Sequence, residues 1–312
     1  MKRISGIQIS ILLILLTGKI FSQNTFEFLR MDMNPRAAAL AGSFVSNSDD
    51  PNVIFYNPAG INTLEGMPVS FSFVKHLLDI NLASLAIARD FEGIGKFAAG
   101  IEYINYGSFE GMTENAVSTG KFGAGEFAFI IGYSNKLDEN FFYGVNAKFI
   151  YSGIENYYST ALAADIGLQY IIPEQLVNVG FSVLNIGSQL QSYKTTKEKL
   201  PLDMRLGISK KLEHLPLRIY LGFNRLSDDQ DKFFDRFRTF TIGMEFNLSK
   251  VLRLRLGYDN EKRKDLKIGT TAGLAGFNIG VGALISGYNF DYSYSSLGSV
   301  GSLNRIGITT TF

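Results

Sequence analysis

Few side chains in this sequence combine the chemistry and the spacing that catalysis requires. The chain has no Cys, and its two histidines, His76 and His214, fall at predicted turns, where a solvated surface histidine is the usual state. No G-x-S-x-G, Walker or H-E-x-x-H motif occurs. We therefore predict no catalytic residue, no cofactor and no enzyme activity.

Two further groups of residues could bind an ion or hold another segment of the chain. Asn47, Asp49 and Asp50 carry oxygen ligands, but they lack the acidic spacing of a calcium-binding loop such as the EF-hand, so we expect no metal site. Arg253 and Arg255 are two residues apart and would point to the same face of a strand. There, two guanidinium groups could clamp carbonyl or carboxylate groups of a packed segment.

The composition excludes several classes of function. The 312 residues include 30 basic and 29 acidic ones, a net charge of +1, which argues against nucleic-acid binding. Without cysteine, neither a disulfide nor a thiolate metal site can form. The charged fraction of 19% lies below the roughly 25% of soluble domains, although no apolar run is long enough for a membrane-spanning helix.

Residues 1–22 have the pattern of a secretory signal peptide. Lys2 and Arg3 form a basic start, an apolar stretch follows at 7–16, and Ser22 is a small residue suited to cleavage after it. The alternative, an anchoring helix, needs about 20 apolar residues, and this stretch is shorter. We expect an exported mature chain of 312 − 22 = 290 residues.

From Met67 to the end, apolar and polar residues alternate strictly. In 252–258 the even positions are Leu, Leu, Leu and Tyr, and the odd positions are Arg, Arg and Gly. A period of two predicts strands with one apolar and one polar face. About fourteen such strands are expected, at 68–76, 79–90, 95–107, 123–137, 140–153, 157–171, 176–188, 202–213, 215–226, 236–249, 251–260, 272–284, 288–296 and 303–312.

Two sets of links separate these runs. Very short links predict tight hairpins between antiparallel neighbours, and they fall at 77–78, 138–139, 214 and 250. Longer polar links alternate with them, at 108–122, 189–201 and 227–235. Short turns on one side and long loops on the other are typical of outer-membrane barrels.

A closed sheet of about fourteen strands is too wide for side chains to fill, so inward apolar faces would surround a void. Apolar faces that point outward into lipid leave the polar faces to line a wet interior. We therefore predict an all-β fold, a transmembrane antiparallel β-barrel. An exported β-sandwich pair or a propeller is the alternative, although the blade repeat is missing. The ionic residues expected in the lumen are Glu102, Lys148, Asp165, Arg205, Arg218, Glu245, Arg253, Arg255 and Asp291.

The assigned faces imply a parity rule for substitutions. Leu254→Arg places a charge in lipid and is expected to cost about 2–4 kcal/mol near the midplane. Arg255→Leu, one residue on and facing the lumen, is expected to be far milder.

Residues 23–66 break the alternation. Asn34 is a candidate N-cap of a short helix that ends before Gly42, and turns are predicted at 47–52 and 57–60. A segment of this size with its own aromatic residues fits inside a wide lumen as a plug, and a periplasmic tail is the alternative. We divide the chain into a signal peptide (1–22), a plug (23–66) and a barrel (67–312).

The plug segment carries a family resemblance. Residues 26–29 (FEFL), 36–42 (RAAALAG), 49–51 (DDP) and 57–60 (NPAG) resemble the N-terminal signature of the PorV/PorQ family. These are type IX secretion outer-membrane proteins related to FadL-like fatty-acid transporters. The regions 97–107 and 206–212, together with the chain length, resemble the shorter PorQ-like branch. The resemblance implies a FadL-like barrel in which the plug motif includes Arg36, Gly42, Asp50, Asn57, Pro58 and Gly60.

Two functions follow from the resemblance. A PorQ-like member would be a monomeric barrel in the outer membrane of a Gram-negative, Bacteroidota-like bacterium. There, besides outer-membrane lipid, it would hold a soluble surface partner within the type IX attachment complex. Its longer loops offer apolar contact residues, which are Phe109, Met112, Tyr193, Phe233 and Phe234. The alternative is a transporter of hydrophobic small molecules, with an apolar pocket between plug and wall lined by Phe44, Val45, Phe55 and Ile61.

Overall fold

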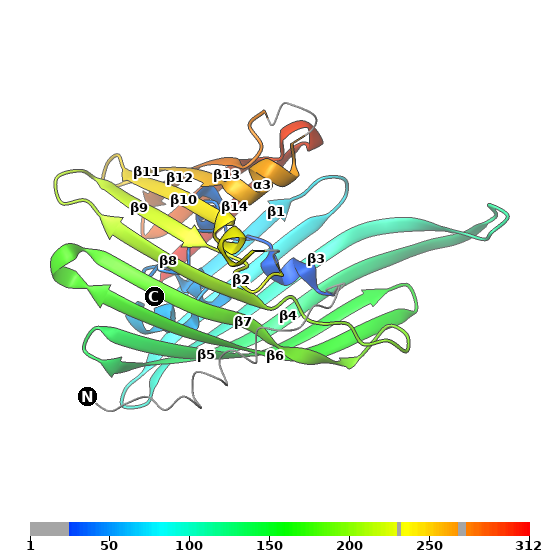
Figure 1. The fold of residues 1–312 in the computed structure, drawn as a ribbon, viewed down its shortest axis with the longest axis horizontal. Coiled ribbons are helices and arrows are strands. Elements are labelled where there is room, and N and C mark those ends of the chain that lie inside the picture. The colour runs from blue at the N-terminus through cyan, green and yellow to red at the C-terminus, as the bar shows by residue number, and fades with distance from the viewer. Residues whose placement is uncertain (1–24, 230–231, 268–272) are drawn as a thin grey trace.

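Fourteen antiparallel strands form a closed barrel in the computed structural model, which describes residues 25–229, 232–267 and 273–312 (Figure 1). Each strand pairs with its neighbours in sequence, and β14 pairs with β1 to close the sheet. The expected signal peptide lies outside the described residues. The strands are β1 Pro68–Lys75, β2 Asn81–Phe91, β3 Gly95–Met112, β4 Ser118–Asp138, β5 Phe141–Ile154, β6 Tyr157–Ile172, β7 Val177–Gln191, β8 Asp203–Lys211, β9 Leu217–Phe223, β10 Phe240–Asn247, β11 Leu252–Asp259, β12 Phe277–Ile285, β13 Tyr288–Ser296 and β14 Ser302–Thr311.

The closed sheet confirms the predicted antiparallel barrel and excludes the sandwich and the propeller. Each of the fourteen alternating runs overlaps one strand, in the predicted order. None of the described helices is long and apolar enough to cross a membrane.

The region 108–122, expected as a long polar link, is instead mostly strand. β3 and β4 both continue through it, with Phe109 opposite Phe122 and their rings stacked at 5.5 Å between centroids. β2 pairs with β3 only as far as Asn105, so residues 106–123 form a two-stranded arm. The arm reaches well beyond the rim of the barrel (Figure 1).

The two ends of the barrel differ in their connections. Short turns follow β2, β4, β6, β8, β10 and β12, and we call this the short-turn end. The opposite end, the long-loop end, carries the arm, the connection 192–202 between β7 and β8, and two longer connections that contain helices. One connection holds the 3₁₀ helix η5 (Phe233–Arg238) and the other holds α3 (Asn260–Asp265), a helix that the alternation gave no sign of.

The inner and outer faces of the barrel have opposite polarity. Along β1, Ser70 and Ser72 are buried inside, whereas Phe71 between them is 46% exposed on the outer surface. Other strands repeat this alternation, and their outward side chains include Leu85, Ile101, Phe129, Ile166, Ile208, Val281 and Ile306. The outer surface is therefore an apolar band suited to hydrocarbon.

Leu254→Arg is expected to lower the free energy of unfolding by about 2–4 kcal/mol, because Leu254 lies on the outer face of β11. Urea unfolding in lipid vesicles measures this loss. The matched control is Arg253→Leu on the inner face. Arg253 is half-buried and, among the residues that the structure describes, makes one hydrogen bond, to Asn289 Oδ1 at 3.2 Å, so its loss should cost about 1 kcal/mol or less. Equal losses for the two variants would contradict the assigned faces.

The predicted mildness of Arg255→Leu is wrong. Arg255 is fully buried and pairs with Glu245 at 2.6 Å and with Asp291 at 2.5 Å. Removing one partner of a buried ion pair costs about 3–5 kcal/mol, so this substitution is as severe as a charge placed in lipid.

Candidate functional site

Residues 25–66, here called the plug, lie inside the barrel as four short helices: η1 Glu27–Arg30, α2 Pro35–Ala39, η2 Pro51–Phe55 and η3 Pro58–Thr63. The last three each follow an Asn or Asp cap and begin with proline. The side chains of Asn34, Asp50 and Asn57 accept hydrogen bonds of 2.9, 2.9 and 3.1 Å from backbone N–H groups two or three residues on. The predicted Asn34 cap is confirmed, and the two predicted turns lead directly into η2 and η3.

The plug runs from the long-loop end to the short-turn end. Near its start, Thr25 N donates to Lys199 O, and Arg30 pairs with Asp228 at 2.7 Å in the long connection before β10. Farther along the chain, η3 packs against β4, β5 and β6. The plug then leads into β1 at Met67, whose N–H donates to the Phe312 carbonyl.

The apolar residues of the plug form its core. Phe44, Val45, Phe55 and Ile61 are all buried, and Phe44 packs edge-on against Tyr56 with 5.1 Å between ring centroids. These residues were expected to line an apolar pocket. Instead, Phe44, Phe55 and Ile61 pack together with wall residues such as Ile130, and Val45 is buried against the wall at Gly207.

Arg36, at the second position of α2, holds the plug to the wall. Its Nε and Nη2 atoms each donate to a Glu245 carboxylate oxygen at 2.9 Å, a bidentate pair with β10. Its Nη1 atom donates to Asp49 at 2.8 Å and to Asp50 at 3.5 Å. The two aspartates considered for calcium thus bind a guanidinium group, and no cluster of metal ligands occurs among the described residues.

The surroundings shift the pKa values of the two neighbouring plug carboxylates, Asp49 and Asp50, in opposite directions. The Asp49 side chain is 48% exposed, and its partial desolvation would raise its pKa, but the Arg36 and Arg218 guanidinium groups outweigh this effect and hold the pKa well below the usual value. Asp50 is buried, and there burial raises the pKa and outweighs the attraction of Arg36. Asp49 is therefore the more firmly ionised partner of the arginine cluster.

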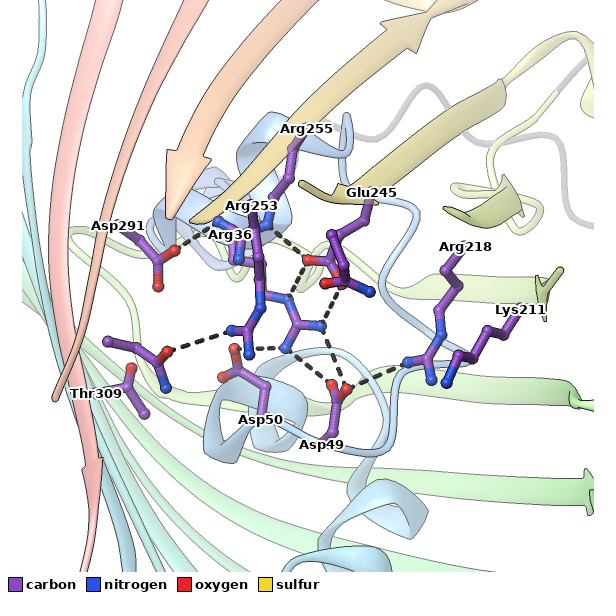
Figure 2. A pocket seen from close by; sticks show the side chains of 12 residues that line it. Arg36, Asp49, Asp50, Lys211, Arg218, Glu245, Arg253, Arg255, Asp291 and Thr309 are labelled. Carbon is purple, nitrogen blue, oxygen red and sulfur yellow. Dashed lines mark hydrogen bonds and ion pairs between the residues drawn. The ribbon is translucent and has the colours of Figure 1, made fainter. Parts of the chain in front are cut away.

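A cavity of about 330 Å³ opens beside Arg36, toward the short-turn end (Figure 2). Plug residues form one side and strands β8, β9, β10, β11, β13 and β14 form the other. Its lining residues are Arg36, Asp49, Asp50, Lys211, Arg218, Glu245, Asn247, Arg253, Arg255, Asn289, Asp291 and Thr309. A smaller cavity of about 50 Å³ lies near the long-loop end and is also polar, with Arg30, Asp32, Asp203, Arg205 and Glu261 among its lining residues.

Arg253 and Arg255 line this larger cavity, but they do not clamp the plug as expected. Arg255 pairs with wall acids, and Arg253 donates to wall residue Asn289. The ion pairs between plug and wall are formed by other arginines, one in the plug and one in the wall. Arg36 reaches out to Glu245, and Arg218 of the wall takes the plug carboxylate of Asp49 at 3.2 Å.

Among the other predicted lumen residues, Arg205 in β8 pairs with Asp203 at 2.7 Å beside the smaller cavity, and three more lie on the opposite wall. Lys148 pairs with fully buried Asp165 at 2.9 Å, and Asp165 Oδ1 accepts from the Asn185 backbone N–H at 2.8 Å. Asn185 has φ +63° at an irregularity between β6 and β7, which turns its backbone toward Asp165. Glu102, also buried, faces the lumen from β3.

The remaining plug-motif residues occupy tight positions. Gly42 has φ +74° just after α2, where a side chain would meet Asp32 and the backbone would be strained. Asn57 also donates to the carbonyl oxygens of Val45 and Leu168 at 2.8 and 3.0 Å. Pro58 starts η3, and a Cβ on Gly60 would lie 2.9 Å from the Asn47 carbonyl oxygen.

A band of inward glycines is the feature that sequence reasoning missed. In each case a Cβ would collide with a neighbouring residue, which is most often part of the plug. On Gly144 it would lie 2.5 Å from Ala59 N, and on Gly257 it would lie 2.6 Å from Ala41 N. The signal was present, since each of these glycines stands between two apolar residues of a strand. The band comprises Gly100, Gly132, Gly144, Gly167, Gly180, Gly207, Gly222, Gly243, Gly257, Gly280 and Gly307.

The predicted loop contact residues fall into different settings. Phe109 and Met112 are 42% and 61% exposed on the arm, and Phe234 is exposed in η5. Tyr193 is half-buried and its hydroxyl donates to Ser152 Oγ on the wall, so it is not a free loop side chain. The Phe233 side chain lies outside the described set.

Comparisons place this fold among known barrels. No protein-family model and no curated protein sequence matches the chain. Among solved structures, the toluene transporter TbuX of Ralstonia pickettii matches with a TM-score of 0.57 and 13% identity, over 89% of this chain and 98% of that one. A Pseudomonas aeruginosa FadL homologue matches with a TM-score of 0.57 and 10% identity, over 90% and 98%. The Pseudomonas putida toluene transporter TodX matches with a TM-score of 0.55 and 13% identity, over 88% and 95%.

The fold is thus similar to that of FadL-like barrels, across nearly the whole length of each protein. At these identities the similarity concerns the fold alone, and the type IX assignment rests on the sequence resemblance.

Proposed function

We propose that this chain is a permanently plugged outer-membrane barrel that anchors a soluble partner at the long-loop end. The observation that carries this proposal is the attachment of the plug along the barrel. Arg30 pairs with Asp228 near the long-loop end, Arg36 pairs with Glu245 beside the larger cavity, and η3 packs against β4, β5 and β6. A lumen closed in this way leaves the outer surfaces to carry the function.

The arm is the surface best suited to hold a partner. Residues 106–123 extend beyond the barrel, and Phe109 and Met112 present apolar side chains beside exposed Glu110 and Glu114. The resemblance to the PorV/PorQ family supports a partner from the type IX attachment complex and a Gram-negative, Bacteroidota-like host. In outer-membrane barrels the longer loops face the cell exterior.

Phe109→Ala with Met112→Ala is expected to reduce the recovery of the soluble partner at least tenfold, because apolar anchors dominate most interfaces. Recovery is measured by affinity purification of the tagged full chain from intact outer membranes, with the amount of barrel held equal. Lys121→Ala, an exposed polar residue on the other strand of the same arm, is the matched control and should leave recovery unchanged. Undiminished recovery from the first variant, and from a chain whose arm is shortened to a two-residue turn, would overturn the proposal.

The structural similarities favour a second candidate, transport of hydrophobic small molecules. Two of the similar structures are toluene transporters, and their barrels match this one over nearly their full length. The two cavities beside the plug are lined by charged groups, which disfavour an apolar cargo. Faster toluene uptake by cells that express the chain would support transport, and unchanged uptake would support the anchor.

A further inference from the structure

We propose that the cavity at the short-turn end binds a small hydrophilic organic anion through a single carboxylate group. The proposal goes beyond the anchor function, because an anchor needs no small-molecule ligand. It rests on the charge balance of the lining, on cationic groups that lack acidic partners, and on the polarity of the remaining surface.

The lining carries one more positive than negative charge. Its five basic residues are Arg36, Lys211, Arg218, Arg253 and Arg255, and its four acidic residues are Asp49, Asp50, Glu245 and Asp291. All four acids already pair with arginine within the cluster. One monovalent anion would therefore neutralise the cavity.

The excess charge is concentrated on groups without an acidic partner. Arg253 makes a single hydrogen bond, to the neutral Asn289 side chain, and Lys211 forms no ion pair with any described residue. Arg255 is fully buried, yet its Nη2 atom has no hydrogen-bond partner in the described part of the chain. A buried donor left in this state is costly, and a carboxylate oxygen is the acceptor that guanidinium groups bind best.

Figure 2 shows how these groups are arranged around the cavity. Arg253 descends from β11 past the Arg36 cluster, while Lys211 and Arg218 approach from the side of β8 and β9. Asp50 lies beside the Arg253 guanidinium and Asp49 lies between Arg36 and Arg218, but both carboxylates already pair with arginine. Arg253 and Lys211 therefore remain the two cationic side chains of the lining without an acidic partner among the described residues.

The rest of the lining defines the body of the ligand. Asn247, Asn289 and Thr309 supply amide and hydroxyl groups, and the lining includes no aliphatic or aromatic side chain. A volume of about 330 Å³ lies at the small end of the range for ligand pockets. The ligand that fits is a small hydroxylated carboxylate, and hydrophobic acids are excluded.

Isothermal titration of the full chain in detergent with gluconate, glucose and inorganic phosphate tests this assignment. We expect one gluconate per barrel, binding that weakens as salt is raised, and no binding of glucose, which lacks the charge. Inorganic phosphate should bind more weakly than gluconate. Tighter binding of phosphate than of gluconate, or equal binding of glucose, would overturn the carboxylate assignment.

Substitutions locate the site. Lys211→Gln with Arg253→Gln should weaken gluconate binding at least tenfold, whereas Lys121→Gln on the arm, which lies outside the cavity, should leave it unchanged. Lys211→Gln alone changes an exposed side chain, so the barrel should remain folded. This single variant should still weaken gluconate binding at least threefold. Gluconate binding that both cavity variants leave intact would overturn the proposed site, and that result would have no bearing on partner recovery through the arm.

Discussion

Replacing Arg36 with Ala is expected to lower the free energy of unfolding by about 3–5 kcal/mol, because it removes the one cation shared by three acidic groups. Glu245 keeps Arg255, and Asp49 keeps Arg218. Asp50, however, is buried and would be left with the neutral Asn52 alone. Urea unfolding in lipid vesicles measures the change.

A surface arginine provides the control for Arg36→Ala. The Arg238 side chain is 68% exposed and pairs with Asp235 at 3.1 Å, one turn away in η5. Such exposed pairs contribute about 0–1 kcal/mol, so Arg238→Ala should be nearly neutral. The Arg36 variant should also make the plug more accessible to protease from the short-turn end. A loss below about 1 kcal/mol would show that the arginine cluster does not secure the plug.

Gly144→Ala is expected to displace η3 and to lower the free energy of unfolding. The loss should lie near the upper end of about 1–3 kcal/mol, the range for overpacking a filled interior. The added methyl group would lie within 2.5 Å of Ala59 N, in the plug backbone, which cannot turn aside as a flexible side chain can. The loss should appear in urea unfolding, together with a higher conductance of the barrel in planar bilayers.

Gly123→Ala is the matched control, since the Cβ added there would meet its nearest atom, the Gly107 carbonyl oxygen, at 3.7 Å. Both glycines are in strands and neither has a positive φ, so the pair differs mainly in what the methyl group meets. Equal stability and equal conductance for the two variants would refute the idea that bare backbone at Gly144 is needed to seat the plug.

Much of the fold follows from local pattern. The fourteen strands were predictable because lipid on one side and water on the other impose opposite polarity on alternate residues. The arm was not, because residues 106–123 stand clear of the barrel and neither face must be uniformly apolar. The plug helices were visible in the sequence because an Asn or Asp cap followed by proline is a local signal.

The partners within the site could not be read from the sequence. The alternation puts Glu245, Arg253 and Arg255 on the polar face of their strands, but Arg36 and Glu245 are 209 residues apart and meet only once the sheet has closed. The plug is therefore held by Arg36, and not by Arg253 and Arg255 as expected. Likewise, the alternation shows that a residue such as Gly144 faces inward, but not that another part of the chain touches it.

The glycine band also determines what the barrel would be without its plug. Many barrel channels select their solutes through the side chains that narrow the pore, but at the positions of the glycine band the wall beneath the plug offers only backbone. Loss of the segment would therefore leave a wide, polar pore through the barrel. Bacteria carrying such a deletion should become sensitive to large hydrophilic antibiotics.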